Sequence, residues 1–388
     1  GEATAMTDFH GVPLGASEEE NMIGLGVPPG LVRKVMHEEA QIASRIFLLD
    51  NSGSTVAPDG NRLQLEGGQR RMVSCSRWDE IKQMAEEHAT WNAKVGTPCQ
   101  FILLNPPSHS EWREGKDLVS LTTGCCSGEE VGRQVGALRH MLDETHPEGM
   151  TPIADRLDAL YEQILREKPR LVAAGQRIVL VLVTDGLPTT ARSGSSTQAD
   201  KDRLVTTLQG MTLNLPVHVV IRLVTNDDTV VEFYNRVDHE VEYNLEVLDD
   251  IQGEAREIRE KGNGWFAYTA ALHRLREGGT SIKEFDLLDE RELAPWEIRT
   301  LCSYLVKPTL APDLPSEPVR FVEALKQHVA MASKVYDPML NKEVPPIHVR
   351  QVAWMMVPFP QNVPLVLSHN GQIMLALLVL CLAWLISA

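Results

Sequence analysis

The sequence predicts an α/β fold in which helices cover both faces of a doubly wound, mostly parallel sheet. Two short apolar runs, residues 46–49 and 178–183, have the length and composition of buried strands. Each run is followed closely by an acid, Asp50 in the first case and Asp185 in the second. Such strands alternate along the chain with helical patterns, which favours parallel strands joined by right-handed crossovers.

The N-terminal part of the chain leads into the first strand. Residues 1–28 show no periodicity and predict an extended arm, and residues 31–43 predict a short helix. A helix is predicted over residues 76–95, because Ser76 can cap its first turn and apolar residues recur on one face. Strands are expected to follow at 100–104 and, at the sheet edge, at 117–121.

The second half of the α/β region continues the alternation. Strands are predicted at 178–183 and 217–224, and helices at 127–145, 152–166, 197–211, 229–237 and 245–261. The helix over 245–261 is predicted because acidic and basic residues recur there at helical spacing. The aromatic stretch Trp265-Phe266-Ala267-Tyr268 has two interpretations, a segment packed on the domain edge or a patch that binds a partner.

The C-terminal third predicts a helical extension and an apolar tail. A helical hairpin is expected over 285–306, and the stretch that follows it, 307–318, is rich in proline. The predicted organisation begins with an N-terminal arm and short helix (1–41) and an α/β domain (42–275). A helical extension (276–306) and a proline-rich linker (307–318) follow. The chain then continues with a helix and a proline-rich apolar segment (319–370) and a tail helix (371–388).

The tail predicts a membrane anchor. Residues 373–388 carry no charge, and with the two residues before them they just reach the length of a spanning helix. A helix that is apolar on all sides has no face to show to water. The alternatives are a buried helix of the soluble core and a helix docked in a partner's groove. The first expectation is a single-pass membrane protein attached by its C-terminal helix.

Charge and cysteine content restrict the partners and the compartment. The net charge of −16 argues against nucleic acid or an anionic lipid surface as a general partner, because both would be repelled. The six cysteines show no Cys-x-x-Cys spacing, and two of them are adjacent. This pattern does not indicate a disulfide framework. The expected compartment is a reducing one, such as the cytosolic face of a membrane or an organelle interior.

The chemistry-bearing residues gather at the predicted strand ends. Asp50, Ser52 and Ser54 form an Asp-x-Ser-x-Ser pattern directly after the first strand. Thr151 stands just before a predicted helix, and Asp185 follows the 178–183 strand. Ligands bind at the carboxyl ends of strands in open α/β sheets. Oxygen donors of this kind suit Mg²⁺, although the same residues also occur as turns and helix caps.

This combination resembles the von Willebrand factor type A domain, whose metal-ion-dependent adhesion site uses the same set of residue types. The resemblance covers about residues 42–275. It implies that the metal ligands are one acid, two serines, a threonine and a second acid, here Asp50, Ser52, Ser54, Thr151 and Asp185. The chain departs from the family by an insertion at 55–76, which is expected to overhang the metal face.

The function expected from these observations is a membrane-anchored, protein-binding or scaffold module. Its cofactor would be Mg²⁺, or Mn²⁺ or Ca²⁺ in its place, and its partner a protein that offers an acidic side chain. One alternative is an accessory subunit of a large organellar membrane complex, with a structural or vestigial metal site. A metal-dependent hydrolase is a second alternative. No nucleotide-binding loop, zinc-protease motif or nucleophile elbow is present, so the chain is not expected to be an enzyme.

Overall fold

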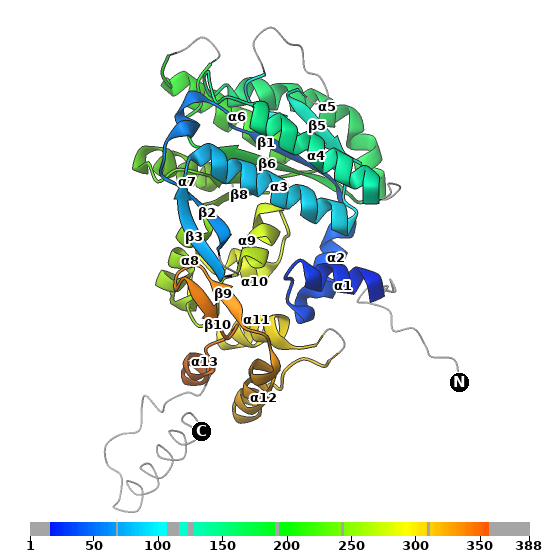
Figure 1. The fold of residues 1–388 in the computed structure, drawn as a ribbon, viewed down its shortest axis with the longest axis vertical. Coiled ribbons are helices and arrows are strands. Elements are labelled where there is room, and N and C mark those ends of the chain that lie inside the picture. Colours follow the sequence, from blue (N-terminus) through cyan, green and yellow to red (C-terminus); the bar gives the residue numbers. More distant parts are fainter. Residues whose placement is uncertain are drawn as a thin grey trace, which may run out of the picture.

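A six-stranded sheet forms the centre of the computed structural model, which describes residues 16–66, 69–106, 116–122, 128–190, 194–241, 244–308 and 311–356. The strand order is β5-β4-β1-β6-β7-β8. Neighbouring strands pair in parallel, except that β5 is antiparallel to β4 at one edge. The predicted α/β class and mostly parallel sheet are therefore confirmed (Figure 1).

The strands are short apolar runs that are buried on both sides, as expected of parallel strands covered by helices. The burial is most complete in the inner strands β6 and β7 and least complete in the edge strands β5 and β8. The strand bounds are β1 Ile42–Leu49, β4 Cys99–Leu103, β5 Leu118–Leu121, β6 Arg177–Thr184, β7 Val217–Leu223 and β8 Leu245–Leu248.

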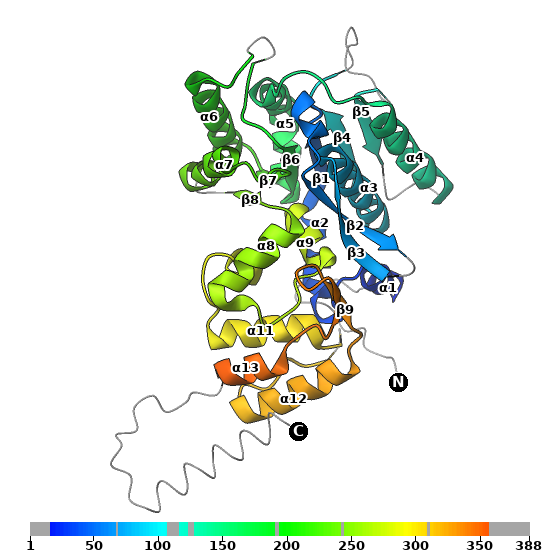
Figure 2. The ribbon, with the colours of Figure 1, turned by 60° about the vertical axis from the view of Figure 1, so that its left-hand side comes forward.

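Helices cover both faces of the sheet, because side chains alternate along each strand. On β1, Phe47 and Leu49 pack into the core beneath α3 (Arg77–Val95) and α4 (Gly128–Glu144). Leu48 packs on the opposite side, into the core beneath three other helices, α5 Ile153–Ala174, α6 Gln198–Asn214 and α7 Asp228–Val241. Figure 2 shows the two helical layers on either side of the strands.

Besides the core that covers both faces of the sheet, a second hydrophobic core lies below the sheet in Figures 1 and 2. Trp265, Phe285 and Phe321 are fully buried in it, and Leu314, from the proline-rich stretch predicted as a linker, is buried there as well. The elements around this core are α1 Ala16–Gly24, η1 Pro29–Leu31, α2 Val32–Ala40, α8 Ile251–Ile258, η3 Arg259–Asn263, α9 Ala270–Glu277, α10 Lys283–Asp286, α11 Pro295–Val306, α12 Pro318–Met331, β9 Val335–Asp337, β10 Lys342–Val344 and α13 Val349–Met356.

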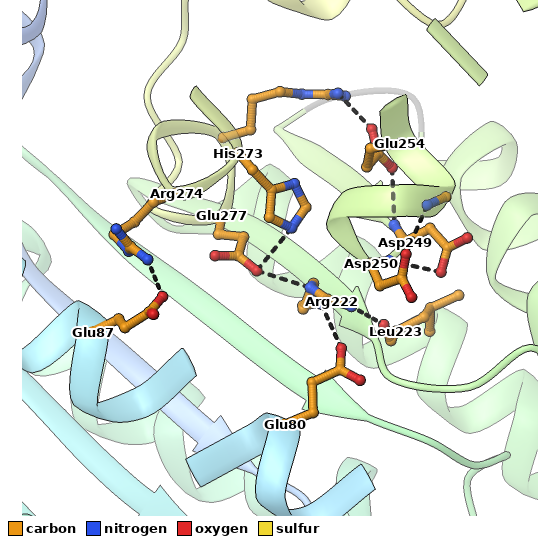
Figure 3. Close-up of polar contacts among 12 residues, drawn as sticks. Glu80, Glu87, Arg222, Leu223, Asp249, Asp250, Glu254, His273, Arg274 and Glu277 are labelled. Atoms are coloured by element: carbon orange, nitrogen blue, oxygen red, sulfur yellow. Dashed lines mark hydrogen bonds and ion pairs between the residues drawn. The ribbon is translucent and has the colours of Figure 1, made fainter. Parts of the chain in front are cut away.

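A buried arginine on β7 lies where the sheet meets the second core. Arg222 pairs with Glu80 of α3 at 2.7 Å and with Glu277 of α9 at 2.8 Å. Glu277 also contacts His88 and His273, each at 3.1 Å. Figure 3 shows Arg222 between its two carboxylates. Charge pairs thus join the α/β layer to the helices beneath it.

The aromatic stretch belongs to the interior of the second core. Trp265, Phe266 and Tyr268 are each at most 4% exposed. Phe266 forms an isolated antiparallel bridge with Ile347. The interpretation of this stretch as a partner-binding patch is therefore wrong, since these side chains are covered by the protein itself.

Two predicted elements differ in type. The helix expected over 245–261 is split, because Leu245–Leu248 adds to the sheet beside β7 and Asp250 then caps α8 by accepting a hydrogen bond from Gly253. Backbone pairing to a neighbouring strand outweighed the helical charge spacing. The predicted N-terminal arm holds helix α1, whose Met22 is buried in the second core; residues 1–15 lie outside the described part.

The insertion forms a hairpin, β2 (Gly60–Glu66) and β3 (Gln69–Cys75). Its Leu63 carbonyl accepts a hydrogen bond from Gln83 on α3, and the Met72 amide donates to Tyr336 on β9. Figure 1 shows the hairpin running from the sheet towards β9 and β10. The expectation that it overhangs the metal face is therefore wrong, since its strands run along α3 and pack there.

Candidate metal centre

The two candidate acids lie side by side at the carboxyl ends of adjacent strands. Leu49, the last residue of β1, is in register with Val183 of β6, and the amide of Asp50 donates to the Val183 carbonyl at 2.9 Å. Asp185 follows the end of β6. In the sheet, β1 lies between β4 and β6, so the chain adds β4 on one side of β1 and β6 on the other. This is the switch point at which such sheets bind ligands.

Asp50 is held in one orientation by the turn that follows it. Its Oδ1 accepts the amide hydrogen of Ser52 at 2.9 Å, and its Oδ2 accepts the Thr184 hydroxyl at 2.6 Å. The carboxylate is fully buried. The Ser52 side chain also interacts with this carboxylate, which can accept about four hydrogen bonds.

The two serines connect the first acid to the second. The hydroxyls of Ser52 and Ser54 are 3.1 Å apart, and Ser54 donates to Asp185 Oδ1 at 2.8 Å. Ser54 belongs to the short helical turn η2 (Gly53–Val56), which turns the chain back over the strand end. The Ser54 hydroxyl therefore connects the turn after β1 to Asp185 at the end of β6.

Thr151 reaches the same point from the loop before α5. A Cβ placed on Gly186 would lie 3.5 Å from the Thr151 hydroxyl and 4.0 Å from the Ser54 hydroxyl. The Gly53 amide donates to the carbonyl of Gly149 at 3.3 Å, which ties this loop to the turn after β1. The Thr151 and Ser54 hydroxyls therefore lie near Gly186, and Ser54 connects them to Ser52 and Asp185.

The electrostatics of this cluster favour a cation. Burial, and then the nearby charge of Asp185, raises the pKa of Asp50 to about 6. Two carboxylates at one buried edge repel each other, and a divalent ion relieves that repulsion. The donor set is two carboxylates and three hydroxyls, which fits a hard ion such as Mg²⁺ and does not fit zinc. Within the described residues, no group of three or more His, Cys, Asp or Glu could hold a metal.

An arginine that the sequence analysis did not single out borders the cluster. Arg77, the first residue of α3, donates to Asp185 Oδ2 at 2.9 Å and makes two 2.6 Å hydrogen bonds to Asp59. The guanidinium therefore neutralises part of the charge on Asp185. No local sequence signal marks this role, because Asp59, Arg77 and Asp185 come together only through the fold.

Arg77→Ala is expected to tighten divalent-metal binding. The guanidinium competes with a metal ion for the charge of Asp185, and unit charges a few ångströms apart near a surface interact strongly enough for roughly a tenfold gain in affinity. Calorimetric titration with Mn²⁺ measures the change. Arg139→Ala is the matched control, since Arg139 is exposed and pairs with Glu86. Unchanged or weaker affinity in Arg77→Ala would show that Arg77 does not compete for this site.

A scan against models of protein families finds no match, and a search of curated proteins finds no match either.

Proposed function

We propose that this chain is a Mg²⁺-dependent protein-binding module with the fold and adhesion site of the von Willebrand factor type A kind. The observation that supports the proposal is the convergence of Asp50, Ser52, Ser54, Thr151 and Asp185 at adjacent strand ends. Oxygen ligands from three separate segments meet at one edge of the sheet. Turns and helix caps alone do not require these segments to share a point.

The residues have distinct tasks in this proposal. Asp50 and Asp185 would supply the negative charge, while Ser52, Ser54 and Thr151 would add neutral oxygens. A bound Mg²⁺ would supply a Lewis-acidic centre with a water-filled position for an acidic side chain of a partner protein. The proposed ligands carry only two negative charges, and Arg77 offsets part of the charge on Asp185. A bound Mg²⁺ would therefore still attract a third carboxylate, from the partner.

Thr151→Ala separates metal binding from partner binding. Thr151 supplies a neutral oxygen, so we expect Mg²⁺ affinity to fall only in part and chelator-sensitive partner binding to fall further. The measurements are Mg²⁺ calorimetry and a pull-down from native membranes with and without chelator. Thr145→Ala is the control, because the Thr145 hydroxyl bonds to the Met141 carbonyl and lies outside the cluster. Equal losses in metal and partner binding would contradict capture of a partner acid through the metal.

The second candidate function is an accessory subunit of a larger membrane complex with a structural or vestigial metal site. The Arg77–Asp185 ion pair favours it, since an internal cation already partners one candidate ligand. Purification in detergent tests it: subunits that copurify at a fixed ratio, in the presence of chelator, support this function over metal-dependent capture.

Membrane attachment by the C-terminal helix remains part of the proposal. Among the residues that the structure describes, no helix is long and apolar enough to cross a membrane. The predicted tail, 371–388, lies outside those residues. We expect deletion of 373–388 to release the chain from membranes, because an uncharged run of large apolar residues gains most from lipid. Carbonate extraction measures this, and full-length protein that is released by carbonate would contradict a spanning anchor.

A further inference from the structure

A buried tyrosine borders the candidate metal centre. Tyr234 belongs to α7, which carries none of the five candidate ligands, and its side chain is buried. Its hydroxyl donates a hydrogen bond to the Gly186 carbonyl at 3.1 Å. Gly186 directly follows Asp185, so α7 is tied to the turn that carries one of the two candidate acids.

The same turn is also held by Thr184. The Thr184 hydroxyl accepts a hydrogen bond from the Gly186 amide at 3.3 Å and donates one to Asp50 Oδ2 at 2.6 Å. Both backbone polar groups of Gly186 are therefore bonded, its amide to Thr184 and its carbonyl to Tyr234. Glycine has no side chain that could restrain it, so these two hydrogen bonds hold the turn after β6 in place.

The position of Gly186 affects the space among the candidate ligands. A Cβ at this residue would lie 3.5 Å from the Thr151 hydroxyl and 4.0 Å from the Ser54 hydroxyl. Ser54 in turn donates to Asp185 Oδ1, and Arg77 donates to Oδ2. A displacement of the turn would therefore change the distances between the oxygens that a metal ion has to bridge.

The Tyr234 hydroxyl acts as a donor and is not needed to fill space. The ring lies in the core beneath α5, α6 and α7, where a phenylalanine would pack without a polar atom to bury. Burial, and next the negative charge of Asp50, raises the pKa of the phenol above its usual value. The hydroxyl therefore keeps the proton that it donates to Gly186.

We propose that Tyr234 is a positioning residue of the metal centre and that it favours Mg²⁺ over Ca²⁺. This role rests on the metal site proposed above and adds the basis of its selectivity. Mg²⁺ demands near-ideal octahedral geometry, whereas Ca²⁺ accepts a larger and more variable set of oxygens. A turn that Tyr234 holds in place keeps the oxygens in one arrangement, which suits the smaller ion.

Tyr234→Phe in the full-length chain tests the proposal, because it removes one hydroxyl and keeps the ring. Calorimetric titration with Mg²⁺ and with Ca²⁺ gives the two affinities. We expect Mg²⁺ affinity to fall about tenfold, as for other residues that orient metal ligands, and Ca²⁺ affinity to fall less than about threefold. Replacement of Tyr234 by p-aminophenylalanine returns a donor to the Gly186 carbonyl and should restore most of the Mg²⁺ affinity.

Tyr268→Phe is the matched control. Tyr268 is a buried tyrosine of the second core, and its hydroxyl is hydrogen-bonded to His273 at 3.2 Å. Both variants lose one buried hydrogen bond, so urea denaturation should show similar, small losses of stability. Only Tyr234→Phe should change the preference for Mg²⁺ over Ca²⁺.

The outcomes distinguish the role of Tyr234 from the existence of the site. A wild-type chain that binds neither ion overturns the metal site and the role of Tyr234 together. If the wild type binds Mg²⁺ and Tyr234→Phe binds it equally well, the site stands and Tyr234 does not position it. Equal losses for Mg²⁺ and Ca²⁺, the same loss in Tyr268→Phe, or no recovery with p-aminophenylalanine would also contradict the positioning role.

Discussion

Asp50→Ala is expected to abolish the binding of Mg²⁺ and Mn²⁺ while the chain stays folded. Asp50 supplies one of only two carboxylates in the cluster. Loss of a residue that merely supports a metal ligand costs about 10–100-fold in affinity, so loss of the ligand itself should cost more than about a hundredfold. The heat of calorimetric titration should disappear.

The fold should survive this substitution at a modest cost. The Ala variant leaves the Thr184 hydroxyl and the Ser52 amide without their acceptor, which destabilises the chain by about 1–3 kcal/mol. Asp158→Ala is the control, because Asp158 pairs with Arg203 at the surface and lies outside the cluster. If metal affinity in Asp50→Ala equals that in Asp158→Ala, Asp50 is not a ligand of the metal.

Arg222→Ala is expected to cause the largest loss of stability. Arg222 is buried between the carboxylates of Glu80 and Glu277, and its removal leaves both without their cation (Figure 3). Breaking a buried ion pair from one side costs about 3–5 kcal/mol. Urea denaturation measures the loss as a shift of the unfolding midpoint.

Arg203→Ala is the matched control for Arg222→Ala. Arg203 also pairs with two acids, Asp155 and Asp158, but all three side chains are largely exposed. Exposed pairs contribute about 0–1 kcal/mol. If both variants lose the same stability, the buried pairs do not hold the sheet to the second core.

The ends of the central strands could be predicted because they depend on local sequence. An apolar run closed by an acid marks β1 and β6 without reference to the rest of the chain. Ser76 caps α3 as predicted, and its hydroxyl accepts the amide hydrogen of Asp79 at 3.1 Å. Asp50 and Asp185 lie side by side because β1 and β6 are parallel neighbours that end at the same edge of the sheet.

Other features depend on contacts that no local pattern encodes. Leu245–Leu248 is a strand because it pairs with β7, although its charges stand at helical spacing. The direction of the β2–β3 hairpin depends on contacts such as that of Met72 with Tyr336, 264 residues apart in the sequence. The burial of Trp265 and the position of Arg77 beside Asp185 arise in the same way, from segments that meet only in the folded chain.

Water-proton relaxation with Mn²⁺ tests the central claim most directly, because it reports both the bound ion and its open position. We predict that relaxation is enhanced to saturation by a single Mn²⁺ per chain, that Mg²⁺ reverses the enhancement, and that acetate lowers it by displacing the bound water. Asp50→Ala should show none of these effects. The absence of saturable enhancement in the wild-type chain would contradict the metal site, and an enhancement that acetate leaves unchanged would contradict capture of a carboxylate.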